Sequence, residues 1–104
     1  MTNRVDLPAK LVSELRRYQF DFASKLASGE TISTQTCTAA VYSGTDASPS
    51  SIISGSATAS GSVVSQNITA GTAGVVYELT CTITTSATRT LLLVGYLAVV
   101  PKLP

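Results

Sequence analysis

Two neighbouring stretches near the C-terminus have opposite patterns of apolar and polar residues. The run GVVYELTCTI at residues 74–83 alternates between apolar and polar positions, whereas LLLVGYLAVV at residues 91–100 is apolar on both sides. Alternation with a period of two is typical of a strand with one buried and one solvated face. A continuously apolar strand is expected to be covered on both faces. The two runs therefore predict two strands in different surroundings.

Shorter runs with the same period precede them. Tyr18, Phe20 and Phe22 share one side of a predicted strand, and residues 31–43 and 62–69 form two more. The stretch SGTDASPSS has the composition of a loop, and one or two short strands are expected around Gly55. About seven short strands with turns near every ten residues predict an all-β fold, an antiparallel sandwich of the immunoglobulin or fibronectin type. A small jelly roll or barrel is the alternative.

The first seventeen residues differ from the rest of the chain. Nine of the thirteen charged side chains lie within residues 1–30, and the remainder of the sequence is rich in Ser and Thr. Leu11, Leu15 and Tyr18 have helical spacing, and Pro8 suits a first helical turn, so a short helix and an extended arm are both open. We therefore divide the chain into an N-terminal arm, residues 1–17, and a sandwich domain, residues 18–104.

The last predicted strand has an apolar outer face that needs a cover. Leu91, Leu93, Leu97 and Val99 can fill the core, which leaves Leu92, Val94, Tyr96, Ala98 and Val100 on the other face. Residues 5–17 of the arm or another subunit could provide that cover, and an open edge here would favour aggregation. The candidate protein-interface residues are Leu11, Leu15, Leu92, Val94 and Tyr96.

The two cysteines allow two interpretations. In an immunoglobulin-like sandwich, Cys37 on the second predicted strand and Cys81 on the penultimate strand would lie at the positions of a disulfide between the sheets. They could equally be two buried thiols that pack as small apolar residues. The charged N-terminus predicts no secretory signal peptide, and a reducing cytoplasm favours the free thiols.

The composition argues against several classes of function. The net charge is +1, which gives no field for attracting nucleic acid, and the longest apolar run is shorter than the roughly 20 residues that span a bilayer. The sequence contains no histidine, and its carboxylates are scattered. We therefore expect no enzymatic activity, no catalytic or metal site, no cofactor, and no binding to nucleic acid or membrane.

Three segments resemble a family of small virion proteins of tailed bacteriophages, described as fibre-tail adaptor or minor virion proteins. They are YQFDFASKLASGETI, TCTAAVYSGTDASPSSIISG and VSQNITAGTAGVVYELTCTITTSATRTLLLVGYLAVV, which together extend over residues 18–100. The most specific parts are the F-D-F…L-x-x-G-E-T-I opening and the G-x-x-Y-x-L-x-C-x-I-T-T strand.

The resemblance implies an immunoglobulin-like virion protein without catalytic residues. It would connect the tail or neck to fibres by contacts with other virion proteins, assemble as a homo-oligomeric ring, and be incorporated into the virion in the bacterial cytoplasm. A capsid decoration (cement) protein and a carbohydrate- or surface-binding module remain as alternatives. The second is weakened by the absence of Trp, since sugar-binding sites stack sugars on aromatic rings.

Overall fold

The computed structural model describes residues 4–7 and 9–101, and its regular secondary structure is almost entirely β-strand. The strands are β1 (Arg4–Asp6), β2 (Lys10–Leu11), β3 (Arg16–Asp21), β4 (Ile32–Ser43), β5 (Ile53–Ser60), β6 (Val63–Ile68), β7 (Val76–Thr85) and β8 (Thr90–Val100). A single 3₁₀ turn, η1 (Pro49–Ile52), precedes β5. This turn begins within the predicted loop and places Ile52 in the core, at the start of the region in which one or two short strands are predicted.

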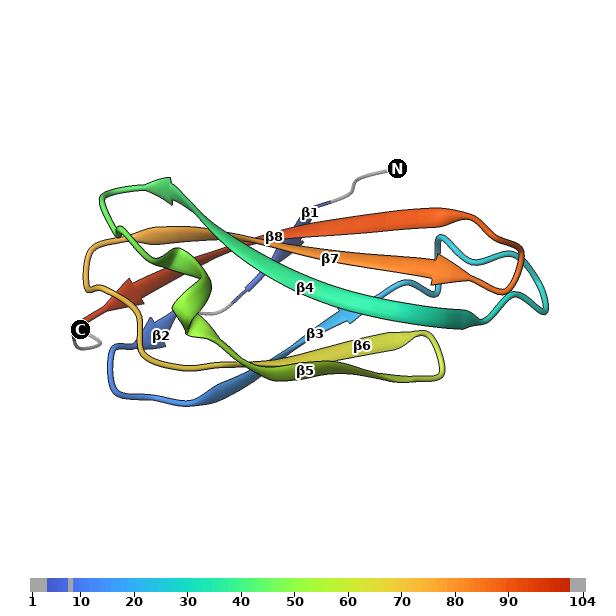
Figure 1. The fold of residues 1–104 in the computed structure, drawn as a ribbon, viewed down its shortest axis with the longest axis horizontal. Coiled ribbons are helices and arrows are strands. Elements are labelled where there is room, and N and C mark those ends of the chain that lie inside the picture. The colour runs from blue at the N-terminus through green and yellow to red at the C-terminus, as the bar shows by residue number, and fades with distance from the viewer. Residues whose placement is uncertain (1–3, 8, 102–104) are drawn as a thin grey trace.

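The strands form two sheets that pack face to face (Figure 1). The larger sheet has the order β1-β8-β7-β4, and β2 also pairs with β8; the smaller sheet has the order β3-β6-β5. Because β1 and β2 share one edge of β8, the sandwich has seven strand positions. The predicted all-β sandwich of about seven strands is confirmed, and its strand pairs are antiparallel except for those of β1 and β2 with β8.

The N-terminal segment takes the first of these strand positions. Residues 4–6 pair with residues 94–96, and residues 10–11 pair with residues 99–100, both in parallel. Of the two forms that the sequence leaves open, the described part of the arm has the extended one. The arm therefore extends the edge of the larger sheet within its own chain.

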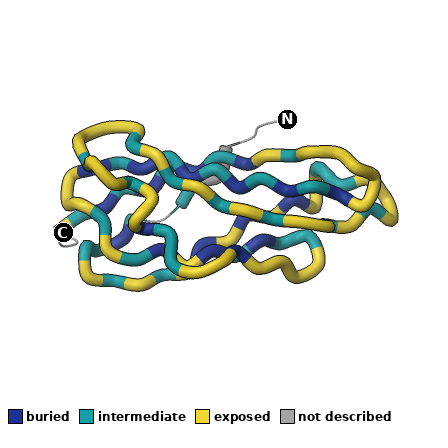
Figure 2. The backbone as a smooth tube through the Cα atoms, viewed as in Figure 1, coloured by how far each residue is buried: buried dark blue, intermediate teal, exposed yellow. Residues whose placement is uncertain are grey.

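The core lies between the inner faces of the two sheets (Figure 2). In β7 the inward positions are buried and the outward positions are half-buried, as the alternation of the sequence predicts. Strand β8 pairs with β7 in antiparallel register from Val76 opposite Ala98 to Thr84 opposite Thr90. The largest buried side chains of the core include Phe20, Phe22, Ile52, Tyr77, Leu79 and Leu97.

The placement of the cysteines corrects one prediction. Cys37 on β4 is directly opposite Cys81 on β7 in the same sheet, so the two do not lie at inter-sheet positions. The reason is that the arm occupies the first strand position, so β4 is the third strand of the sandwich and lies in the same sheet as β7. Both residues are free thiols. The contact with Cys37 raises the pKa of the Cys81 thiol above its ordinary value, and burial raises it further.

Hydrogen bonds to buried side chains hold the loops at the ends of the sandwich. The Tyr77 hydroxyl donates to Asp46 Oδ2 at 2.5 Å and accepts from the Thr72 amide at 2.9 Å. At the other end Glu30 accepts hydrogen bonds from Arg89 and from the Thr85 hydroxyl. These bonds connect segments that are far apart in the sequence.

Gly71 stands where a side chain would not fit. It has φ of +101°, in the left-handed region, and a Cβ there would lie 3.0 Å from Val99 Cγ2. The loop before β7 therefore packs closely against β8 only with glycine at this position.

Candidate protein-interaction surface

The outer face of β4, β7 and β8 carries almost no charge. Glu78 is the only charged residue in these three strands. Around it the outward positions are threonines on β4 and β7 and apolar residues on β8. A broad sheet face with so little charge requires little desolvation of ions when a partner covers it.

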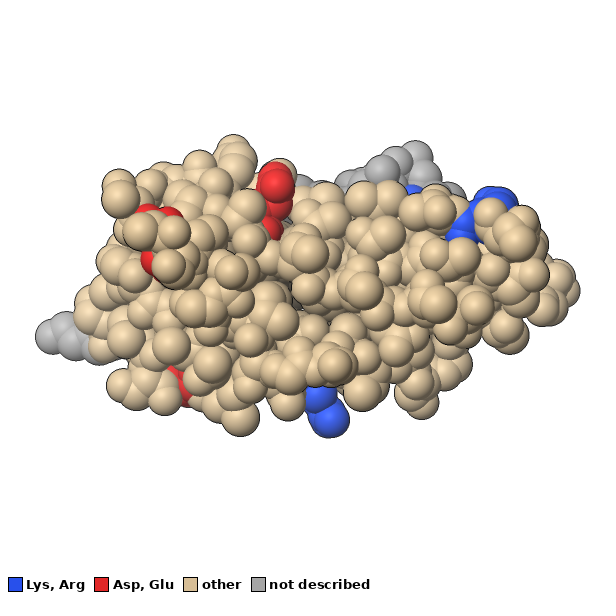
Figure 3. Space-filling model, in the orientation of Figure 1, with Lys and Arg blue, Asp and Glu red and all other residues tan. Residues whose placement is uncertain are grey.

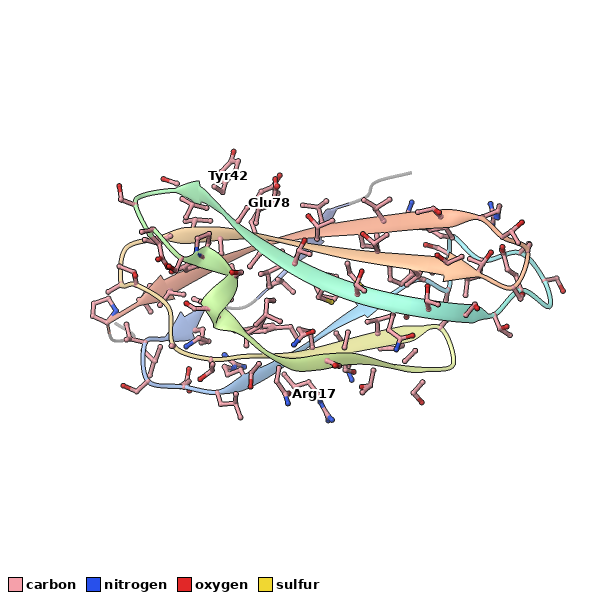
Figure 4. All side chains as sticks on the ribbon, in the orientation of Figure 1. Arg17, Tyr42 and Glu78 are labelled. Carbon is pink, nitrogen blue, oxygen red and sulfur yellow. The ribbon has the colours of Figure 1, made fainter. Side chains whose placement is uncertain are left out.

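A tyrosine–glutamate cluster, made of Tyr42, Glu78 and Tyr96, lies on this face. The two rings have their centroids 4.6 Å apart at an interplanar angle of 57°, and the Tyr96 hydroxyl donates to Glu78 Oε2 at 3.2 Å. Tyr42 is 64% exposed, and Figure 4 shows it projecting from the sheet next to Glu78. Exposed tyrosines are typical of protein contact sites, because they combine a large apolar ring with a hydrogen-bonding group.

The local backbone explains how Tyr42 reaches Tyr96. The pairing of β4 with β7 shifts between Val41 and Ser43, which is the signature of a β-bulge. The bulge lies at Tyr42, near the end of β4, and the ring contacts Tyr96 although β7 separates the two strands. Sequence reasoning missed Tyr42 and Glu78. Its available signals were the break in alternation at Val41-Tyr42 and the single charge within residues 74–83.

The structure brings together three of the five predicted interface residues. Leu92, 41% exposed, Val94 and Tyr96 lie along the outer face of β8. Leu11 is half-buried on β2, opposite Val100 at the far end of β8, and Leu15 is 60% exposed just before β3. The contact role of these five residues stays a prediction, but only the β8 residues and the tyrosine–glutamate cluster form one surface.

The arm covers the edge of β8, whereas the predicted cover concerned its outer face. Residues 4–6 and 10–11 of the arm pair with β8 through their backbones, so they lie beside that strand in the plane of the sheet. This pairing removes the open edge that would favour aggregation. Leu92 and Tyr42 remain exposed on the outer face.

Lys10 stabilises the turn of the arm that follows β2, a role that the sequence did not predict. Its side chain is buried, and Nζ donates to the carbonyl oxygens of Leu11 at 2.7 Å, Val12 at 3.3 Å and Glu14 at 2.7 Å. Burial lowers the pKa of Lys10, and the Glu14 carboxylate partly opposes that shift. The three bonds use all the ammonium protons and fix the turn that leads from the larger sheet to the smaller one.

The described residues offer no assembly of groups for metal chemistry. Within residues 4–7 and 9–101, no three His, Cys, Asp or Glu side chains come close enough to hold a metal ion. Nor does this part of the chain contain a helix of the length and apolarity needed to cross a membrane. The surface drawn in Figure 3 is mostly uncharged, with single charged side chains far apart.

The sequence matches a known family over residues 10–93, most of the chain. That family is described as the podophage GP4 fibre-tail adaptor protein gp77. The chain belongs to this fibre-tail adaptor family. It is thus a structural adaptor of a phage virion, which links tail and fibres by binding other virion proteins. No curated protein and no solved structure matches the chain.

Proposed function

We propose that this adaptor joins tail and fibres as a ring of identical copies, and that the outer face of β4, β7 and β8 is its main contact surface. The observation that carries the proposal is the exposure of Tyr42 and Leu92 on three neighbouring strands, β4, β7 and β8, that contain one charged residue. Exposed apolar surface of this kind marks sites of protein association. Area burial alone performs the function, and no catalytic step is involved.

The family match favours the adaptor over a capsid decoration protein. The two roles differ in copy number, since a decoration protein covers the shell and an adaptor occupies only the tail. Quantitative mass spectrometry of purified virions would give the number of copies per particle. A small number supports the adaptor ring, and a number comparable to the major capsid protein contradicts it.

A charge introduced into the face tests the contact surface. We expect Leu92→Asp to fold normally, because Leu92 is 41% exposed, and to reduce incorporation of the adaptor into virions at least about tenfold. The matched control is Ser28→Asp, an exposed loop residue away from both sheet faces. Incorporation is measured by complementing a phage that lacks the adaptor gene and counting adaptor and fibre copies per particle. Equal incorporation of the two variants would contradict the proposed surface.

A further inference from the structure

Glu78 limits what can cover the outer face of the larger sheet. It is half-buried between Ala40 and Tyr96, its neighbours in the sheet register, and the Tyr96 hydroxyl already donates to its carboxylate. A partner that lies over this face removes water from the carboxylate, which is unfavourable unless the partner supplies a cation. The chemistry of the surface therefore favours an occupant that carries a positively charged group.

Arg17 is such a group, and it lies on the opposite side of the same molecule. It is exposed on the outer face of β3, and within the described residues it has no hydrogen bond or ion pair. The other cations whose side chains are described have partners or are buried: Arg16 bonds to Ala9 and lies over Tyr18, Arg89 binds Glu30, and Lys10 binds three carbonyls. Lys25 also makes an interaction within the chain. Figure 4 shows Arg17 and Glu78 projecting from opposite layers.

The surroundings of Arg17 match those of Glu78 in being uncharged. Its neighbours on the outer face of the smaller sheet are Gln19, Ser65 and Asn67, all of them polar and neutral. Asp21, the other charge on this face, lies at the far end of β3 and accepts hydrogen bonds from the Ala23 amide and the Ser62 hydroxyl. Contact between the two faces would thus bring one free cation towards one anion.

We infer that a second copy of the chain is the occupant, with Arg17 of one copy bound to Glu78 of the next. The inference rests on the proposed function, because it requires copies to assemble. The guanidinium would pair with the carboxylate and lie beside the rings of Tyr42 and Tyr96, an arrangement that combines an ion pair with cation–π contact. The molecule measures 43 × 27 × 22 Å, so either broad face is large enough for the ~800 Å² per partner of a specific interface.

The contact joins two different surfaces, so it is heterologous. After the first contact, one copy keeps a free Arg17 face and the other keeps a free Glu78 face, so further copies can add in the same way. Such contacts form closed rings when the rotation between copies closes, and filaments when it does not. This geometry provides a physical route to the ring proposed above.

Charge reversal tests the pairing directly. We expect wild-type protein to form a defined oligomer in sedimentation velocity, and R17E and E78R each to weaken its association at least about tenfold, because like charges then face each other. The double variant R17E/E78R restores the opposite charges and should assemble again. Q19E is the matched control, since it adds a negative charge at the next outward position of β3 and keeps Arg17. Circular dichroism verifies that every variant is folded.

The outcomes separate this inference from the proposed function. If wild-type protein assembles and the single reversals do not weaken it, the Arg17–Glu78 contact is wrong while the ring and the contact surface stand. The contact is also wrong if the double variant stays dissociated, or if Q19E disrupts assembly as strongly as R17E. If purified wild-type protein is monomeric at all concentrations, the inference and self-assembly both fail, and the incorporation test with Leu92→Asp still decides whether the face binds another virion protein.

Discussion

The two faces of β8 have similar composition and different surroundings. On the inner side Leu93, Leu97 and Val99 are buried in the core, whereas on the outer side Leu92 is exposed and Tyr96 is half-buried. Apolar residues stabilise the fold only where folding removes them from water. The same kinds of side chain on one strand therefore serve folding on one face and are available for association on the other.

Truncating one leucine on each face of β8 tests this difference most directly. Leu97→Ala should lower the free energy of unfolding by about 2–5 kcal/mol, because it leaves a cavity in a fully buried site. Leu92→Ala should change it by about 0.5 kcal/mol or less, as is usual at exposed positions. Urea denaturation followed by circular dichroism measures both. Similar losses for the two variants would show that the outer face is also part of the folded core.

Lys10 is a cation that is buried within the arm, where it contributes to folding. Lys10→Met removes the donors to the carbonyls of Leu11, Val12 and Glu14, and should destabilise the protein by about 1–3 kcal/mol. The Val12 amide, which donates to the Val100 carbonyl, should then exchange its hydrogen faster. Leu15→Ala, in the turn that follows, is the control and should leave exchange unchanged. Unaltered exchange at Val12 in Lys10→Met would mean that strand pairing alone holds the arm.

Glu30 is a charged residue whose partners, Arg89 and Thr85, belong to the same chain. Its side chain is 3% exposed, and the hydrogen bonds from Arg89 and then Thr85 lower its pKa from 4.5 to about 2. A depressed carboxylate pKa stabilises the fold at pH values above 4.5, and this stabilisation is lost as the pH falls towards 2. The melting temperature of wild-type protein should fall across this window.

The matched variant for this pH dependence is Glu30→Gln, in which position 30 no longer titrates. Its melting temperature should fall less between pH 4.5 and pH 2 than that of the wild type. The slope that remains is expected from Asp46, whose pKa is lowered by the Tyr77 hydroxyl and then by the Ser48 amide. Identical pH profiles for Glu30→Gln and wild type would contradict the role of this carboxylate.

The smallest effect concerns Cys37 and Cys81, which face each other on neighbouring strands. Cys81 is buried and its thiol pKa is raised, so it should not react with a thiol reagent in the native protein. In the native protein the half-buried Cys37 should react slowly or not at all. In denaturant both thiols should react. Absence of reaction in denaturant without a reductant would reveal a disulfide instead.

Local pattern predicts much of the fold because burial in a sheet repeats every two residues. The alternation of residues 74–83 identifies the inward residues of β7, and the aromatic residues from Tyr18 to Phe22 identify those of β3 and its end. The sandwich class follows from these strands and their turns. The outward set on β8, including Leu92, Val94 and Tyr96, also follows from alternation along that strand.

Tertiary structure decided what local pattern could not. Sequence spacing does not specify which strands are neighbours, so it could not predict that Cys37 and Cys81 share one sheet or that the arm pairs with the edge of β8. The tyrosine–glutamate cluster depends on a bulge in β4 and on the pairing of β4, β7 and β8. Arg17 became a candidate contact residue only because the fold places it on the opposite side of the sandwich from Glu78. The sequence by itself determined which residues face inward, because that is a property of each strand. The association of distant strands determined the candidate surface, because it depends on long-range pairing.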